Sequence, residues 1–211
     1  QWMYGVSPEP LLPPPRGNIG SLVKGYRMTH PYERLTPDCV VDCVEAIGLR
    51  SDLRLLALNS YENRVYQVGL EDADPVIVKF YRPERWTRGQ ILEEHAFAQE
   101  LVDNGLSVVA PMPIHGNTLH EAEGFLIAAF LRRGGHAPEL DNLDHLLGLG
   151  RTLGRMHGVG RAAPFTERID YTLERWLIEP MAYLGETWIP AELRPAWDSL
   201  GKDLIDRATR L

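Results

Sequence analysis

The chain has 211 residues, and 22 Lys and Arg against 29 Asp and Glu give it a formal net charge of −7. It is 44% hydrophobic, which argues against disorder over most of its length, and its acidic balance argues against nonspecific nucleic-acid binding. The longest apolar run, Phe125–Leu131, is far shorter than the roughly 20 residues of a membrane span, and two cysteines cannot form a secreted disulfide framework. We therefore expect a cytoplasmic globular protein that binds neither nucleic acid nor membrane.

The first ordered element is expected near Thr36. Residues 1–27 begin with Gln and are rich in proline, so we interpret them as a disordered or non-native leader, with a proline-rich recognition segment as the alternative. Thr36 and Pro37 have the pattern of a helix start, a hydroxyl N-cap followed by proline at the first helical position. This helix is expected to end near Gly48, where glycine favours a C-terminal cap.

A sheet and a second helix are predicted next. Three runs are rich in branched and aromatic residues: Leu53–Leu58, Arg64–Leu70 and Pro75–Tyr81. Only short polar breaks separate them, so we expect an antiparallel meander of adjacent strands. In Thr87–Asn104 the apolar residues recur at helical spacing, which predicts a helix.

The rest of the chain changes from strand-like to helical patterns. Further strands are predicted at Met112–His115, Thr118–Leu119 and Gly124–Leu131. Helices are predicted at about Leu143–Gly158, Tyr171–Leu184 and Ala191–Leu211. A mostly β half with one helix, followed by an all-helical half, indicates an α+β fold in two lobes, residues 28–133 and 134–211, with a hinge at 132–139.

Lys79 is the unusual residue of the predicted strands. It stands inside the apolar run Val76–Tyr81, where a lysine is costly unless it meets an anion. Fifteen residues later the predicted helix supplies Glu94, with Glu93 beside it. In nucleotide phosphotransferases a strand lysine binds the α- and β-phosphates and a helix glutamate holds that lysine. The alternative is a solvent-facing lysine and a solvated acidic helix face, which taken alone is the commoner meaning of such a pattern.

The loop between the first two strands has the right position to cover phosphates. It lacks the glycine-rich motif of protein kinases, but it offers Asn59, Ser60 and Asn63, whose side chains and neighbouring amides can donate to phosphate oxygens. A polar hairpin turn is the alternative, because Ser and Asn favour turns for local reasons.

Two further patterns are assigned structural roles. Gly148, Gly150 and Gly154 lie in a helical pattern that follows no strand, so we expect close packing of helices over small residues and not a dinucleotide-binding turn. Cys39 and Cys43 lie one helical turn apart without further ligands nearby in sequence, and we expect them to be buried free thiols.

Five segments together carry a family resemblance, which spans most of the chain from about Met28. They are Leu58–Val68, Val78–Thr87, Gln90–Leu101, Gly150–Arg161 and Leu177–Pro180. They resemble the YihE/RdoA-type bacterial Ser/Thr protein kinases of stress response, within the aminoglycoside phosphotransferase and choline kinase superfamily. Met28 also has the context of a native start, which would leave residues 1–27 as an upstream extension.

The resemblance implies a protein-kinase-like two-lobe fold that uses ATP and Mg²⁺. By it, Lys79 is the phosphate-binding lysine, Glu94 its helix partner and Ser60 the serine of the nucleotide loop, with Asn63 nearby. Glu94 is preferred to Glu93 because its spacing to Leu101 resembles the family's interval. Strand Phe125–Ala129 would lead into the hinge, and backbone groups near Ala129 and Leu131 would meet the adenine edge.

The sequence departs from the family at one decisive place. The catalytic loop His-Gly-Asp-x-His-x-x-Asn is absent, and so is the later metal-binding aspartate. We therefore expect the catalytic base and the Mg²⁺ ligands beyond Leu211, no catalytic or metal-binding residue within this chain, and no phosphate transfer by the chain alone.

The function expected is that of an ATP-dependent Ser/Thr protein kinase, a monomer that transfers the γ-phosphoryl group to a hydroxyl of a protein substrate or of itself. Two alternatives remain open. One is a kinase for a small molecule, such as an aminoglycoside, choline or a homoserine-like alcohol. The other is a nucleotide-binding or interaction module without catalysis.

Overall fold

The computed structural model describes residues 30–210, so the leader expected at residues 1–27 lies outside the described residues. Within the described part, residues 30–169 form one compact unit and residues 170–210 belong to another. We call them the sheet unit and the helical unit. The α+β class expected from the sequence is confirmed, because a five-stranded sheet with helices precedes a purely helical segment.

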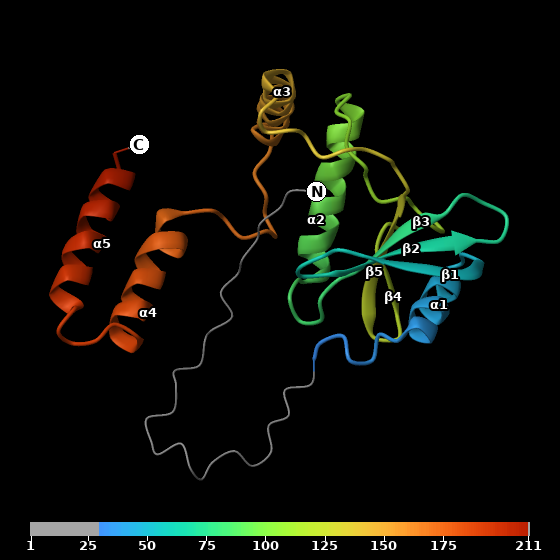
Figure 1. The fold of residues 1–211 in the computed structure, drawn as a ribbon, viewed down its shortest axis with the longest axis horizontal. Helices are drawn as coiled ribbons and strands as arrows, with labels where there is room; N and C mark the ends of the chain where they lie inside the picture. Colours follow the sequence, from blue (N-terminus) through green and yellow to red (C-terminus); the bar gives the residue numbers. More distant parts are fainter. Residues whose placement is uncertain (1–29, 211) are drawn as a thin grey trace, which may run out of the picture. The chain divides into compact units, whose positions relative to one another are not determined.

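The sheet is antiparallel and has the strand order β1-β2-β3-β5-β4 (Figure 1). Its strands are β1 (Ser51–Leu58), β2 (Arg64–Leu70), β3 (Val76–Phe80), β4 (His120–Ala122) and β5 (Phe125–Leu131). The first three form the predicted meander, and β5 returns beside β3. The central position of β3 gives its side chains a covered face on each side.

Burial alternates along β3. Val76, Val78 and Phe80 are buried in a core cluster on one face of the sheet. Lys79 lies between them in sequence and therefore points to the opposite face, since successive side chains of a strand alternate. Its partners in register are Val65 on β2 and Ala128 on β5.

Helix α1 (Pro37–Ala46) covers the first face of the sheet (Figure 1). Thr36 caps it as predicted, because the Thr36 hydroxyl accepts a hydrogen bond of 3.2 Å from the amide of Cys39. Cys43 and Val44 on this helix are fully buried in the core cluster. Cys43 is thus the buried free thiol that the sequence predicted, and Cys39 is half-buried.

Helix α2 (Arg88–Asp103) lies on the other face, and its start is fixed by a capping box. The Thr87 hydroxyl accepts from the Gln90 amide at 3.1 Å, and the Gln90 side chain accepts from the Thr87 amide at 3.1 Å. Ile91 of α2 is buried in a second core cluster together with Leu119 and Ala128. The lysine-bearing face of the sheet is therefore the one that α2 covers.

The strands predicted at Met112–His115 and Thr118–Leu119 are wrong. That segment contains isolated bridges only, and the strand β4 begins one residue later, at His120. Pro111 and Pro113 have no N–H to donate to a ladder, which explains why the first run does not extend into a strand.

Helix α3 (Leu143–Gly160) belongs to the sheet unit, and the lobe boundary predicted at 133/134 stays a prediction. The segment after α3 packs on α2. The rings of Phe97 and Phe165 meet edge to face with centroids 5.2 Å apart. The boundary between the compact units consequently follows Ile169.

The close packing expected at the glycines of α3 is not seen. A Cβ added at Gly148, Gly150 or Gly154 would meet nothing within 4 Å among the described residues. No residue of α3 is fully buried in the described part of the chain. These glycines therefore lie on an open helix surface.

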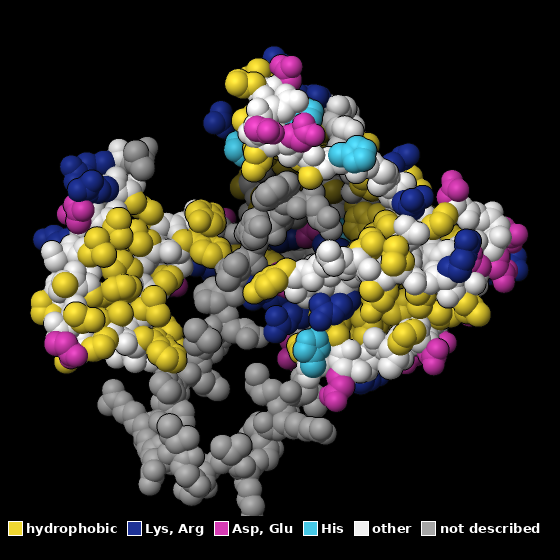
Figure 2. Space-filling model, in the orientation of Figure 1, with side chains coloured by type: hydrophobic (Ala, Val, Ile, Leu, Met, Phe, Trp, Pro, Cys, Tyr) yellow, Lys and Arg dark blue, Asp and Glu magenta, His cyan; other side chains and the backbone are white. Residues whose placement is uncertain are grey.

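The helical unit contains a π-helical turn (Glu174–Ile178), α4 (Glu179–Thr187) and α5 (Arg194–Ala208). Pro180 has no N–H for an α-helical bond to the Trp176 carbonyl, which accounts for the wide turn before α4. Figure 2 shows hydrophobic side chains gathered on the surface of α4 and α5. Within residues 30–210 no helix combines the length and the apolar character that a membrane crossing needs.

Candidate functional site

The candidate site is centred on an ion pair between strand β3 and helix α2. Nζ of Lys79 lies 3.1 Å from Oε1 of Glu94, and both side chains are only 19% exposed. The alternation of β3 turns the lysine toward α2, and the first turns of α2 carry the carboxylate over that face. An ammonium group held in this way keeps further donor hydrogens for a second anion.

Glu94 has a second cationic partner, Arg168, which the sequence analysis missed. The Arg168 guanidinium donates to Oε2, the carboxylate oxygen that Lys79 does not bind. Burial would raise the pKa of Glu94, but the charges and hydrogen bonds of Lys79 and Arg168 outweigh it and hold that pKa below its ordinary value. Glu94 is therefore a carboxylate at neutral pH.

The ring of Tyr81 lies against the ammonium group of Lys79. Nζ of Lys79 is 4.4 Å from the ring centroid of Tyr81, a cation–π contact. The Tyr81 hydroxyl and Nε2 of His95 are 2.7 Å apart, and Nδ1 of His95 is 2.9 Å from the hydroxyl of Thr118. Burial lowers the pKa of His95 to about 4, so its ring is neutral at pH 7. This chain of contacts fixes the ring of Tyr81 without adding a third cation.

The loop between β1 and β2 places Ser60 and Asn63 together. The Ser60 hydroxyl donates to the Asn63 carbonyl at 2.6 Å, and the Asn63 side chain accepts from the amide of Arg82 at 3.2 Å. These bonds hold the loop against the segment just after β3, at Arg82, three residues beyond Lys79 in sequence. Their predicted contact with phosphate stays a prediction.

Ala129 and Leu131 lie on β5, one and three residues beyond Ala128, the register partner of Lys79. The carbonyl of Ala129 accepts a hydrogen bond of 2.8 Å from the amide of Met112. Of the two predicted adenine contacts, Leu131 lies at the end of the strand, where ladder pairing stops. The adenine contact itself stays a prediction.

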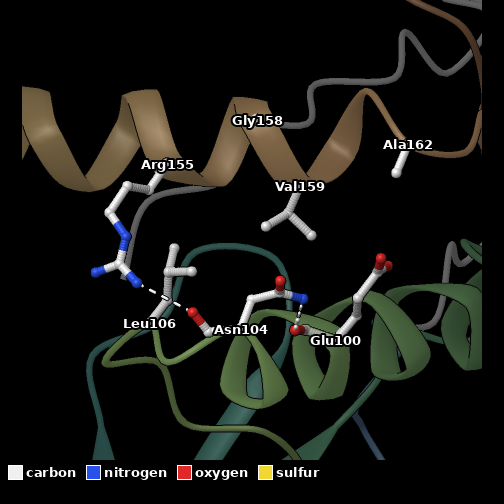
Figure 3. A pocket seen from close by; sticks show the side chains of 7 residues that line it. All are labelled: Glu100, Asn104, Leu106, Arg155, Gly158, Val159 and Ala162. Carbon is white, nitrogen blue, oxygen red and sulfur yellow. Dashed lines mark hydrogen bonds between the residues drawn. The ribbon is translucent and has the colours of Figure 1, made fainter.

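The depression shown in Figure 3 does not coincide with the ion pair of Lys79 and Glu94. Among residues 30–210, no group of three or more His, Cys, Asp or Glu side chains is placed to hold a metal ion. The depression, of about 340 Å³, lies between α2 and α3. Its lining residues are Glu100, Asn104, Leu106, Arg155, Gly158, Val159 and Ala162.

The partners of Glu93 and Arg168 were not predicted from the sequence. Adjacent residues on a helix are about 100° apart, so the two acids Glu93 and Glu94 cannot both face the sheet. That spacing signalled that Glu93 needs a different partner. Nothing local to the sequence pointed to Arg168, which is separated from Glu94 by 74 positions.

Comparison with known proteins identifies the family of the chain. The sequence profile of the phosphotransferase enzyme family (APH) matches residues 54–209. "Stress response kinase A" of Escherichia coli is 45% identical over 179 residues, which are 84% of this chain and 55% of that protein. "Serine/threonine protein kinase RdoA" of Salmonella typhimurium is 46% identical over 179 residues, with the same two coverages. The chain thus spans about half the length of the curated relatives it matches.

A solved structure shares the fold. It is described as amicoumacin kinase hAmiN in complex with AMP-PNP, Ca²⁺ and Ami, and it superposes with a TM-score of 0.61 at 22% identity. The match covers 79% of this chain and 52% of that one. The kinase-like α+β fold and the superfamily that the sequence motifs predicted are confirmed. The profile, the relatives and the fold lead to one conclusion: the chain belongs to the phosphotransferase enzyme family.

Proposed function

We propose that the complete protein is an ATP-dependent Ser/Thr protein kinase that transfers the γ-phosphoryl group of ATP to a hydroxyl. The observation that carries this proposal is the half-buried pair of Lys79 and Glu94 on adjoining elements. A relative that is 46% identical is named a serine/threonine protein kinase, which supports a protein acceptor.

The residues present fit the phosphate end of a nucleotide. Lys79 would bind phosphate oxygens, and Glu94 would hold its ammonium group in place while the phosphates arrive. The Ser60–Asn63 loop and the end of β5 near Leu131 would contact the phosphates and the adenine. Bound ATP would supply the phosphoryl group to be transferred.

The described residues do not fit the role of a Mg²⁺ site. Among residues 30–210 no group of three or more His, Cys, Asp or Glu side chains is placed to hold a metal ion, and Glu94 is already neutralised by two cations. The proposed base and metal ligands belong to the family's His-Gly-Asp-x-His-x-x-Asn loop, which is not among these 211 residues.

The central test is phosphate transfer by the complete protein and its Lys79→Ala variant. We expect the variant to stay folded, because the side chain is not part of either core cluster, and to lose activity by about a thousandfold or more. Lys202→Ala, which removes an exposed lysine of α5, is the matched control and should keep full activity. Full turnover by Lys79→Ala would refute the assignment.

A small-molecule kinase is the second candidate. It is compatible with the profile match, because the description of the phosphotransferase enzyme family does not name a protein acceptor. Incubating the complete protein with γ-labelled ATP and either a generic protein or a set of aminoglycosides and amino alcohols separates the two. Label on protein hydroxyls supports the first candidate, and label only on small alcohols replaces it with the second.

A further inference from the structure

The segment after α3 is bound to α2 by an unusual set of hydrogen bonds. The carboxylate of Glu93 accepts from three consecutive backbone amides, those of Thr166 at 2.5 Å, Glu167 at 3.1 Å and Arg168 at 2.7 Å. The hydroxyl of Thr166 donates to the same carboxylate at 3.1 Å. These amide bonds lower the pKa of Glu93 against the opposing effect of burial. We call residues 166–168 the docked loop.

Arg168 extends from the docked loop to the ion pair. Its side chain is 20% exposed, and its guanidinium binds Oε2 of Glu94 while lying 4.6 Å from the ring centroid of Trp86. Trp86 directly precedes the cap of α2 and so fixes the guanidinium from the side. The Arg168 side chain is thus held by a carboxylate at its tip and by the ring of Trp86, over which its guanidinium lies.

The other end of α2 is also tied to α3. Arg155 donates to the carbonyl of Asn104 at 3.0 Å (Figure 3). It also donates to the carbonyl of Gly105 at 3.1 Å. A helix C-terminus leaves carbonyls without helical partners, and a cation is favourable there. Residues 155–168 therefore hold α2 near both of its ends, and only Arg168 also contacts the ion pair.

We propose that Arg168 is a positioning residue, which occupies one oxygen of Glu94 so that the other faces Lys79, while Glu93 anchors the loop that carries it. This inference rests on the proposed function, because Lys79 is taken to bind the phosphates of ATP. A carboxylate with one fixed oxygen cannot turn both oxygens to the lysine, which keeps ammonium hydrogens available for phosphate. Moving the docked loop would break at once the bonds that Glu93 and Glu94 make with it.

The first experiment measures ATP affinity of the complete protein by calorimetry. Arg168→Gln should weaken ATP binding about tenfold. Without Arg168, Glu94 no longer holds the Lys79 ammonium group in position, and the attraction between that group and the phosphates becomes weaker. Arg168→Lys should recover part of the loss, because it restores the charge without the planar guanidinium. Arg161→Gln, with the same loss of charge at an exposed position after α3, is the matched control and should stay within about twofold.

The second readout is the pKa of the Glu94 carboxyl, followed by carbon-detected NMR without nucleotide. Four side chains bear on Glu94: Lys79 from β3, Arg168 from the docked loop, Tyr81 after β3 and His95 on α2. Arg168→Gln should raise this pKa, because it removes a cation that stabilises the carboxylate. The acid limb of ATP binding should move to higher pH in the same variant.

The outcomes separate the two proposals. If the unaltered protein fails to bind ATP, the proposed function is wrong, and the Glu94 titration still tests the positioning role. If it binds ATP but Arg168→Gln binds equally well with an unchanged Glu94 pKa, the positioning role is overturned. Should Arg168→Gln fail to fold by circular dichroism, Glu93→Ala takes its place, since it keeps Arg168 but removes the acceptor that anchors the loop. Weaker ATP binding by Glu93→Ala supports the proposal, and unchanged binding overturns it.

Discussion

The sheet unit and the helical unit differ in how far their apolar side chains are buried. In the sheet unit Val68, Val78, Phe80 and Ile127 have no exposed surface at all. In the described part of the helical unit, the buried residues are two glycines, Gly185 and Gly201. Large apolar side chains of this unit remain exposed, among them Leu173, Trp188, Leu193, Leu200 and Leu204.

The difference teaches which part of the chain supports the site. Lys79, Glu94 and Arg168 all belong to the sheet unit, whose two core clusters lie on the two faces of β3, the strand that carries Lys79. The helical unit has weaker internal support, and two of its buried polar atoms, Nε1 of Trp176 and Nε of Arg194, have no hydrogen-bond partner among the described residues. We therefore expect the geometry of the site to outlast partial unfolding of the helical unit.

Amide hydrogen exchange gives the largest contrast. Amides of β3 and β5 should exchange only by global unfolding, because they lie in the centre of the sheet between two cores. Amides of α4 and α5 should exchange about a thousandfold faster, since opening them exposes little additional apolar surface. Mass spectrometry of the 211-residue chain measures both in one experiment. Equal protection of the two units would contradict the comparison.

Truncating one apolar side chain in each unit tests the same difference energetically. Phe80 is fully buried and meets Tyr66 and Phe125 edge to face, so Phe80→Ala should cost about 3–5 kcal/mol of unfolding free energy. Leu204 is 42% exposed, and Leu204→Ala should cost less than about 1 kcal/mol. Urea denaturation followed by circular dichroism supplies both values. A large loss of unfolding free energy in Leu204→Ala would mean that another part of the protein buries this side chain of α5.

His95 predicts a pH dependence confined to the sheet unit. Burial lowers its pKa from 6.5 to about 4, so the unfolded chain takes up the proton first as pH falls. Stability is therefore complete above about pH 6.5 and decreases by about 3 kcal/mol down to about pH 4. His95→Gln removes the titrating group, so the difference between the two urea stability profiles isolates its effect. Parallel profiles between pH 4 and 6.5 would show that His95 is not buried in this way.

The smallest effect concerns the open glycines of α3. Because a Cβ at Gly148 meets nothing within 4 Å among the described residues, Gly148→Ala should raise the stability of the sheet unit by about 0.5–1 kcal/mol. Thermal unfolding detects a gain of this size. A loss of stability would instead show that another part of the protein packs against this glycine.

Local patterns predicted most of the elements but few of their long-range partners. Thr36 and Thr87 both act as helix caps, and β2 spans the residues expected, because caps and strand alternation are encoded within a few positions. The strand expected at Met112–His115 failed where prolines remove backbone donors. The predicted Lys79 and Glu94 come together across 15 positions. The contact of Arg168 depends on how α3 returns the chain to α2, which no local pattern encodes.

The alternation of β3 has a consequence for which sequence changes this fold can tolerate. Deleting or inserting one residue between Val76 and Phe80 would send the ammonium group of Lys79 among the aliphatic side chains under α1 and bring a hydrophobic side chain to Glu94. Such an error cannot persist as a folded but inactive protein, because the misplaced charge would itself prevent folding. The apolar core under α1 thus makes correct folding depend on the correct position of the Lys79 ammonium group. A point substitution of Lys79, by contrast, can abolish activity while leaving the fold intact.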